Sequence, residues 1–142
     1  MSKIWIVAAQ SSCAKILETE TPLGALREVE LLEHPAARAH QRDLMSDRPG
    51  RSFDSGGEGR HAMESEVEPK HHEAMVFAKQ IAARLESGRI AGDFQELVLV
   101  AGPEFLGLLR HSLSDATKQH ISKTIDKNLV HMDAETIREH LI

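Results

Sequence analysis

The sequence predicts an α/β (or α+β) fold in a single domain, with about five strands in a mixed sheet, roughly three or four helices and one long Gly/Arg-rich loop. Three features support this prediction. Short apolar runs separated by turn signals open the chain, a strongly periodic helix follows in its middle, and buried strands then alternate with helices. The length of 142 residues is that of one domain, taken here as residues 1–142.

The first part of the chain predicts an antiparallel meander of three strands. Ile4–Ala9 is a continuous apolar run, which is typical of a strand buried on both faces. Gln10-Ser11-Ser12 predicts a tight turn into a second strand over Cys13–Thr19. Thr21-Pro22-Leu23-Gly24 is a further turn signal, and residues 26–32 are predicted as the third strand.

Periodicity then disappears, which predicts a long loop over about residues 33–68 that is interrupted at most by a short helix at about 36–45. This segment holds four of the nine glycines, with arginines and carboxylates between them. Because a compact domain keeps such a segment chiefly when it is functional or disordered, we take the loop as the candidate functional segment.

Pro69 predicts the start of a long helix, because a proline at the first helical position lacks only an N–H that would have no partner there. Gly88 predicts its end. The apolar side chains between them share one helical stripe, which consists of Ala74, Phe77, Ala78, Ile81 and Leu85.

The last third alternates strands and helices. Leu97-Val98-Leu99-Val100 predicts a short buried strand, and Gly102-Pro103 leads directly into another helix. Residues 121–130 allow a further strand, and Asp133 is a good N-cap for the last helix. This alternation predicts crossover units that cover a mixed sheet.

Composition limits the classes of function. The net charge of −5 and the pI near 6.0 argue against a generally basic nucleic-acid binder, although a local basic patch remains open. The single cysteine, Cys13, excludes an intramolecular disulfide and is expected to be a small buried hydrophobe. The sequence shows neither a signal peptide nor an apolar run of the ~20 residues that a membrane span needs, so we expect a cytoplasmic protein without membrane contact.

Nearly the whole chain resembles the bacterial family described as host attachment protein, or protein required for attachment to host cells. The most specific motifs are Arg42-Asp43-Leu44, Ser-Asp-Arg-Pro-Gly-Arg-Ser-Phe-Asp at residues 46–54 and Gly-Arg-His-Ala-Met-Glu at residues 59–64. The run at residues 97–110 and Ile125-Asp126-Lys127-Asn128-Leu129 support the same resemblance.

A more distant resemblance, by position and order of elements, is to the middle domain of archaeal and eukaryotic peptide-chain release factors. In that domain a strand meander leads to a loop with a Gly-Gly-Gln motif, then to a long helix and a buried strand that ends in a glycine-rich turn. Here Gly56-Gly57-Glu58 precedes the long helix and Ala101-Gly102-Pro103 follows the buried strand. Glu58 replaces the glutamine, and because the length is that of one domain we expect neither a codon-reading nor a partner-binding domain.

The loop chemistry leaves two interpretations open. The arginines and the glycine backbone suit phosphate oxygens, which makes the loop a candidate RNA or ligand contact. Asp43, Asp47 and Asp54 interleave with the arginines, so internal salt bridges are an equal competitor. The candidate binding residues are Arg48, Gly50, Arg51, Asp54, Gly56, Gly57, Arg60 and His61.

Catalysis is the weaker interpretation. A carboxylate such as Glu58 is poorly suited to a site of phosphates and carbonyls unless it is protonated, pairs with Arg60 or binds a metal. The histidines and carboxylates around His61 match no compact metal-ligand motif, so no metal and no cofactor are expected. Glu58 and His61 remain the candidate residues of a hydrolase.

We therefore expect a binding module, and a non-enzyme in preference to an enzyme, that acts in translation at the ribosome or tRNA through residues 48–61. The alternative is an interaction protein that is required, directly or indirectly, for attachment to host cells, and it implies a protein partner. A homodimer is also open, because the apolar N-terminal strand would pair at a free sheet edge.

Overall fold

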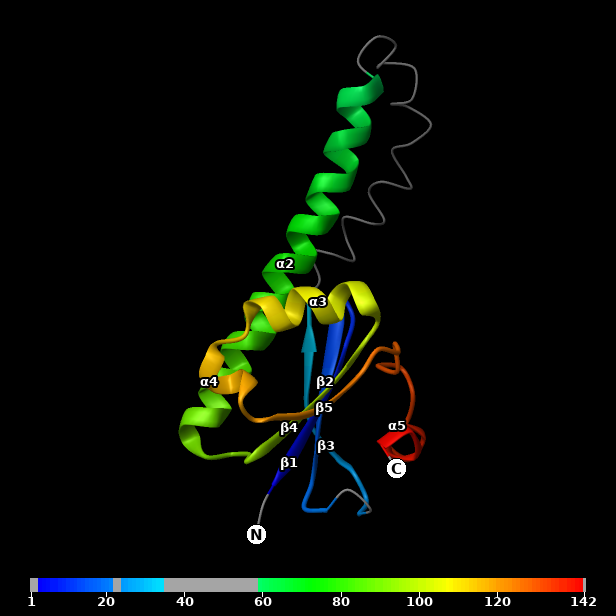
Figure 1. The fold of residues 1–142 in the computed structure, drawn as a ribbon. Helices are drawn as coiled ribbons and strands as arrows, with labels where there is room; N and C mark the ends of the chain where they lie inside the picture. The colour runs from blue at the N-terminus through cyan, green and yellow to red at the C-terminus, as the bar shows by residue number, and fades with distance from the viewer. Residues whose placement is uncertain (1–2, 22–23, 35–58, 142) are drawn as a thin grey trace.

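The computed structural model describes residues 3–21, 24–34 and 59–141, with side chains from residue 71 onward in the last range. These residues form one sheet with helices on both of its faces (Figure 1). The elements are β1 (Ile4–Ala9), β2 (Cys13–Thr19), β3 (Arg27–Glu33), α2 (Gly59–Ala91), β4 (Glu96–Ala101), α3 (Pro103–Ser112), α4 (Asp115–Lys118), β5 (Ile121–Ile125) and α5 (Ala134–Leu141). The expected short helix at 36–45 lies outside the described residues.

The five strands form a single mixed sheet in the order β3-β2-β1-β4-β5. β1 pairs antiparallel with β2 and parallel with β4; β2 pairs antiparallel with β3, and β4 parallel with β5. The predicted α/β fold with an N-terminal meander is therefore confirmed, and the described residues contain four helices. The expectation that the N-terminal strand pairs at a sheet edge is wrong, because β1 occupies the centre of the sheet.

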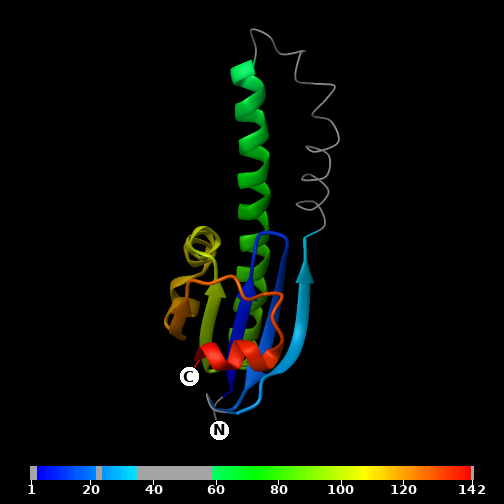
Figure 2. The ribbon, with the colours of Figure 1, turned by 90° about the vertical axis from the view of Figure 1, so that its right-hand side faces the viewer.

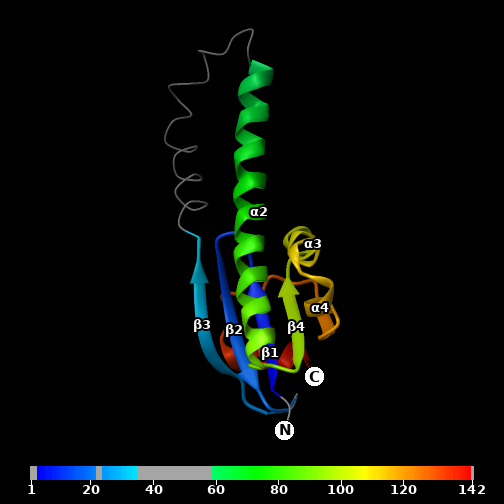
Figure 3. The same ribbon diagram turned by 90° about the vertical axis from the view of Figure 1, so that its left-hand side faces the viewer.

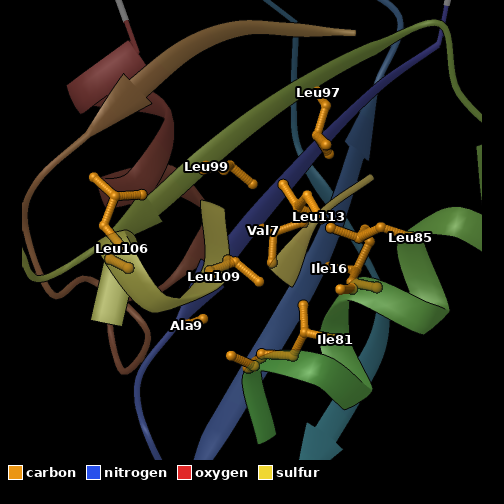
Figure 4. Close-up of a cluster of buried hydrophobic side chains, with 14 of the residues drawn as sticks. Val7, Ala9, Ile16, Ile81, Leu85, Leu97, Leu99, Leu106, Leu109 and Leu113 are labelled. Carbon is orange, nitrogen blue, oxygen red and sulfur yellow. The ribbon is translucent and has the colours of Figure 1, made fainter. Parts of the chain in front are cut away.

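Alternate residues of β1 enter two separate cores, which explains why the whole strand is apolar. Trp5, Val7 and Ala9 face α2 and α3, and Figure 4 shows this cluster. Ile4, Ile6 and Ala8 face the opposite side, where α5 and the chain before it cover the sheet.

Asp133 caps α5 as predicted, since its Oδ1 accepts the Thr136 N–H at 2.8 Å.

Both edge strands pair irregularly with their neighbours. The register skips Val29 of β3, because Ile16 faces Glu30 while Leu17 faces Glu28. In β5 the register skips Ser122 in the same way. Such bulges bend an edge strand and discourage pairing with another chain.

Helix α2 begins at Gly59, earlier than predicted, so Pro69 lies inside the helix and not at its start. The predicted loop therefore ends too late, because residues 59–68 are helical. The prediction gave most importance to the proline as a start signal. Residues 62–68, however, are mostly alanine, methionine and glutamate, which have good helix propensity.

The predicted end of α2 is also wrong. The helix passes Gly88 and ends at Ala91, where Gly92 follows with φ of +76°, the left-handed conformation that suits glycine. Gly88 has another role, because a Cβ there would lie 2.9 Å from the Cζ3 and Cη2 atoms of Trp5 and 3.3 Å from Phe94. Glycine thus lets the helix approach the buried indole closely.

The lower part of α2 is tied to α4 by one carboxylate. Glu86 Oε1 accepts hydrogen bonds from Thr117 Oγ1 at 2.6 Å and Ser114 Oγ at 2.8 Å, and Glu86 Oε2 accepts one from Arg89 at 2.8 Å. The Arg89 guanidinium first, and then the two hydroxyls, lower the pKa of Glu86 from 4.5 to about 2.

The close approach at Gly88 predicts that Gly88→Ala destabilises the protein. Forcing the buried Trp5 and Phe94 rings to shift outweighs the gain in helix propensity, so we expect a net loss of about 1–2 kcal/mol in urea unfolding. Gly107→Ala is the matched control, because Gly107 is an exposed helical glycine with nothing within 4 Å of a Cβ. It should stabilise by about 0.5–1 kcal/mol. Equal effects of the two substitutions would contradict the close packing.

The lowered pKa of Glu86 predicts a specific pH dependence. The ionised carboxylate contributes stability above pH 4.5, and this contribution is lost as the pH falls from 4.5 towards 2. Glu86→Gln should therefore lower the free energy of unfolding most at neutral pH, and its difference from wild type should shrink steadily below pH 5 in urea titrations. A difference that stays constant from pH 7 to pH 3 would show that Glu86 has an ordinary pKa.

Candidate functional site

Helix α2 projects far beyond the sheet. Its 33 residues span about 50 Å at ~1.5 Å per residue, whereas the strands of six or seven residues span only about 20 Å. Figures 1, 2 and 3 show its N-terminal part extending past the edge of the sheet at which β4 ends. We call residues 59–70 the arm, and the other described residues the body.

The arm leaves the body at a clamp between β3 and α2. His34, which follows β3 and is 7% exposed, approaches Glu73 Oε1 with its Nε2 at 2.7 Å. Its ring also stacks on Phe77, with centroids 5.3 Å apart and planes within 10°. The backbone N–H of His34 donates a hydrogen bond to the backbone carbonyl of Ser12 at 2.9 Å. These contacts hold the end of β3 and the residue after it against α2, at the point where the arm joins the body.

For Arg60 and His61 the structure describes the backbone, which lies in the first turn of α2 at the far end of the arm. The other predicted site residues lie outside the described residues: Arg48, Gly50, Arg51, Asp54, Gly56, Gly57 and Glu58. The chain connects them directly to Gly59, because Glu58 immediately precedes the first residue of the helix.

A polar cluster at the end of β1 was not predicted from the sequence. The Gln10 Nε2 lies 3.2 Å from Ser12 Oγ, 3.2 Å from His131 Nε2 and 3.5 Å from Cys13 Sγ. Gln10 Oε1 accepts a hydrogen bond from Asn128 Nδ2 at 3.0 Å. The cluster therefore ties the segment before α5 to the β1–β2 turn.

The polar side chains of this cluster form hydrogen bonds with one another, so the cluster holds the two loops together. Lys15 strengthens it, since its Nζ donates to the Met132 carbonyl at 2.8 Å. The sequence signal for the cluster was the position of its residues just after predicted strands. Polar residues that follow the ends of parallel strands meet at one edge of a sheet.

Cys13 is buried and free, as expected for a small apolar side chain. Over the part of the chain that the structure describes, no group of three His, Cys, Asp or Glu side chains is arranged to hold a metal ion. Among the same residues, no helix is long and apolar enough to cross a membrane.

Comparison with known proteins identifies the family. Residues 5–141 match the model of the family described as protein required for attachment to host cells. The chain belongs to this family. The match includes the arm, the Gln10 cluster and all of both cores except Ile4, so the family model extends over nearly the whole described fold.

One similar protein is the uncharacterized protein RP470 of Rickettsia prowazekii (strain Madrid E). It is 27% identical to this chain over 125 residues, which cover 85% of this chain and 75% of RP470. The name of that protein gives no activity.

The Gln10 cluster predicts that Gln10→Ala loosens the segment before α5. Net hydrogen-bond contributions of about 0.5–1.5 kcal/mol each imply a local loss of about 1–2 kcal/mol, or roughly 5–30-fold faster amide hydrogen exchange at residues 128–132. Ser11→Ala, at an exposed position of the same turn, is the control and should leave exchange unchanged. Unchanged exchange in both variants would show that the cluster does not hold this segment.

Proposed function

We propose that this member of the host-attachment family is a non-enzymatic binding module that contacts the ribosome or tRNA through residues 48–61. The observation that supports the proposal is the arm. A helix that extends far beyond its own domain allows the residues at its end to enter a site that the body is too wide to enter. Arg60 and His61 follow Gly59, the first residue of this helix.

The order of elements supports the choice of partner. In the release-factor middle domain, which this chain resembles, a meander precedes the Gly-Gly-Gln loop, and a long helix and a buried strand with a glycine-rich turn follow. The described chain has the meander β1–β3, the long helix α2, and β4 followed by Gly102 in the same order. This order of elements supports the proposed similarity to that domain.

The residue chemistry favours binding over catalysis. Arg48, Arg51 and Arg60 offer planar guanidinium groups suited to phosphate oxygens. Glu58 stands where release factors have glutamine, and a carboxylate is repelled by phosphates. Because the whole chain carries a net charge of −5, the proposed contact is local to the arm and the residues that precede it.

Ribosome co-sedimentation tests this proposal. The variant Arg48→Ala/Arg51→Ala/Arg60→Ala should bind at least about tenfold more weakly than wild type, a loss of ~1.4 kcal/mol or more. Its salt dependence should also be shallower, because fewer phosphate contacts release fewer counterions.

A matched control removes the same charge from exposed positions of the body: Lys79→Ala/Arg110→Ala/Lys118→Ala. This variant should bind ribosomes like wild type. Wild-type protein that fails to co-sediment at both low and physiological salt would contradict the translation proposal. Equal weakening by both triple variants would contradict the assignment of the contact to residues 48–61.

The second candidate is an interaction protein needed for attachment to host cells, and the family description favours it. In that case the arm would contact a protein. Protease treatment of intact bacteria separates the direct form of this role from the first proposal. Digestion of the protein from the outside would support a direct surface role, whereas protection together with ribosome binding would support the first.

A further inference from the structure

The position of Pro69 within α2 defines a weak point in the arm. Proline has no backbone N–H, so the carbonyl of Ser65, four residues earlier, lacks its helical hydrogen-bond donor. The helix nevertheless continues from Gly59 through Pro69 to Ala91. Bends in long helices occur preferentially at such interruptions of the hydrogen-bond ladder.

The body holds the helix firmly just after this point. Glu73, one turn beyond Pro69, approaches His34 at 2.7 Å, and Phe77, the next turn along, is 1% exposed and stacks on the same imidazole. Ala78 and Ile81 follow in the core and are fully buried. The helix therefore changes within about one turn, from an interrupted hydrogen-bond ladder at Pro69 to firm contact with the body at Glu73.

We propose that Pro69 is a hinge about which residues 59–68 of the arm bend relative to the body, with the His34–Glu73 clamp holding the helix directly after it. This hinge is a property of the helix and does not depend on the identity of the partner. Its consequence is that the far end of the arm takes up a range of positions while the body stays unchanged.

The expected movement follows from the geometry of the helix. Residues 59–68 form a lever of about 15 Å at ~1.5 Å per residue. A proline bend of about 20° moves Ala62 by about 4 Å and the end of the arm by about 5 Å. Distances between two spin labels resolve changes of this size.

Spin labels at Ala62 and Lys118 measure the hinge, and labels at Ala83 and Lys118 provide the control within the body. Ala83 and Lys118 are exposed, and the buried Cys13 is replaced by alanine so that only the introduced cysteines react. The wild-type distance distribution from Ala62 to Lys118 should be broad. In Pro69→Ala, which restores the missing N–H, it should become narrow and single, while the Ala83–Lys118 distribution stays unchanged.

Glu68→Ala is the matched control on the arm, because it changes the neighbouring residue and leaves Pro69 in place. It should keep the broad wild-type distribution. Equal widths in wild type and Pro69→Ala would overturn the hinge, whether both are narrow or both are broad. Narrowing in Glu68→Ala to the same extent would overturn it as well, because the missing N–H would then not be the cause.

Discussion

The packing of the C-terminal part of α2 against the sheet is the constraint on which the rest of the structure depends. Trp5 lies at its centre, with its ring 4.9 Å from that of Phe94 and the helix backbone at Gly88 close against it. The indole N–H is satisfied by Glu18 at 3.2 Å, so the ring can be buried without an unpaired donor. This contact fixes the axis of the packed part of α2 on the sheet, and the arm leaves the body from the end of this fixed part.

Most elements could be predicted from the sequence, because local periodicity is enough to recognise them. The structure confirms β1 and β2 with the expected bounds, and the apolar run Leu97–Val100 forms the centre of β4. The two ends of α2 could not be predicted in the same way. Pro69 and Gly88 are both ordinary boundary signals, yet one lies within a helix and the other packs against Trp5. Only the tertiary contact shows that Gly88 serves close packing and that Gly92 provides the positive φ that ends the helix.

The candidate site could be predicted only as a segment and a set of residue types. The structure adds that Arg60 and His61 lie on a projecting helix and not in a loop. It also brings together residues that no local motif connects. Gln10 meets Asn128 and His131 across more than a hundred residues of sequence, and His34 meets Glu73 across 39. Spacing rules describe neighbours along a helix or strand, so contacts between distant loops lie beyond them.

The division between body and arm bears on stability, because the described buried side chains lie in the body. Among the side chains that the structure describes, the two buried cores are formed by the strands, by helix residues from Phe77 onward and by four residues of the connecting segments, Phe94, Leu113, Leu129 and Val130. Half-buried side chains such as Leu32 and Ala74 pack at the margin of the α2 core. Each large core side chain contributes about 1.5–3 kcal/mol through burial. Because the buried side chains that the structure describes lie in the body, substitutions at the far end of the arm are expected to leave the body folded.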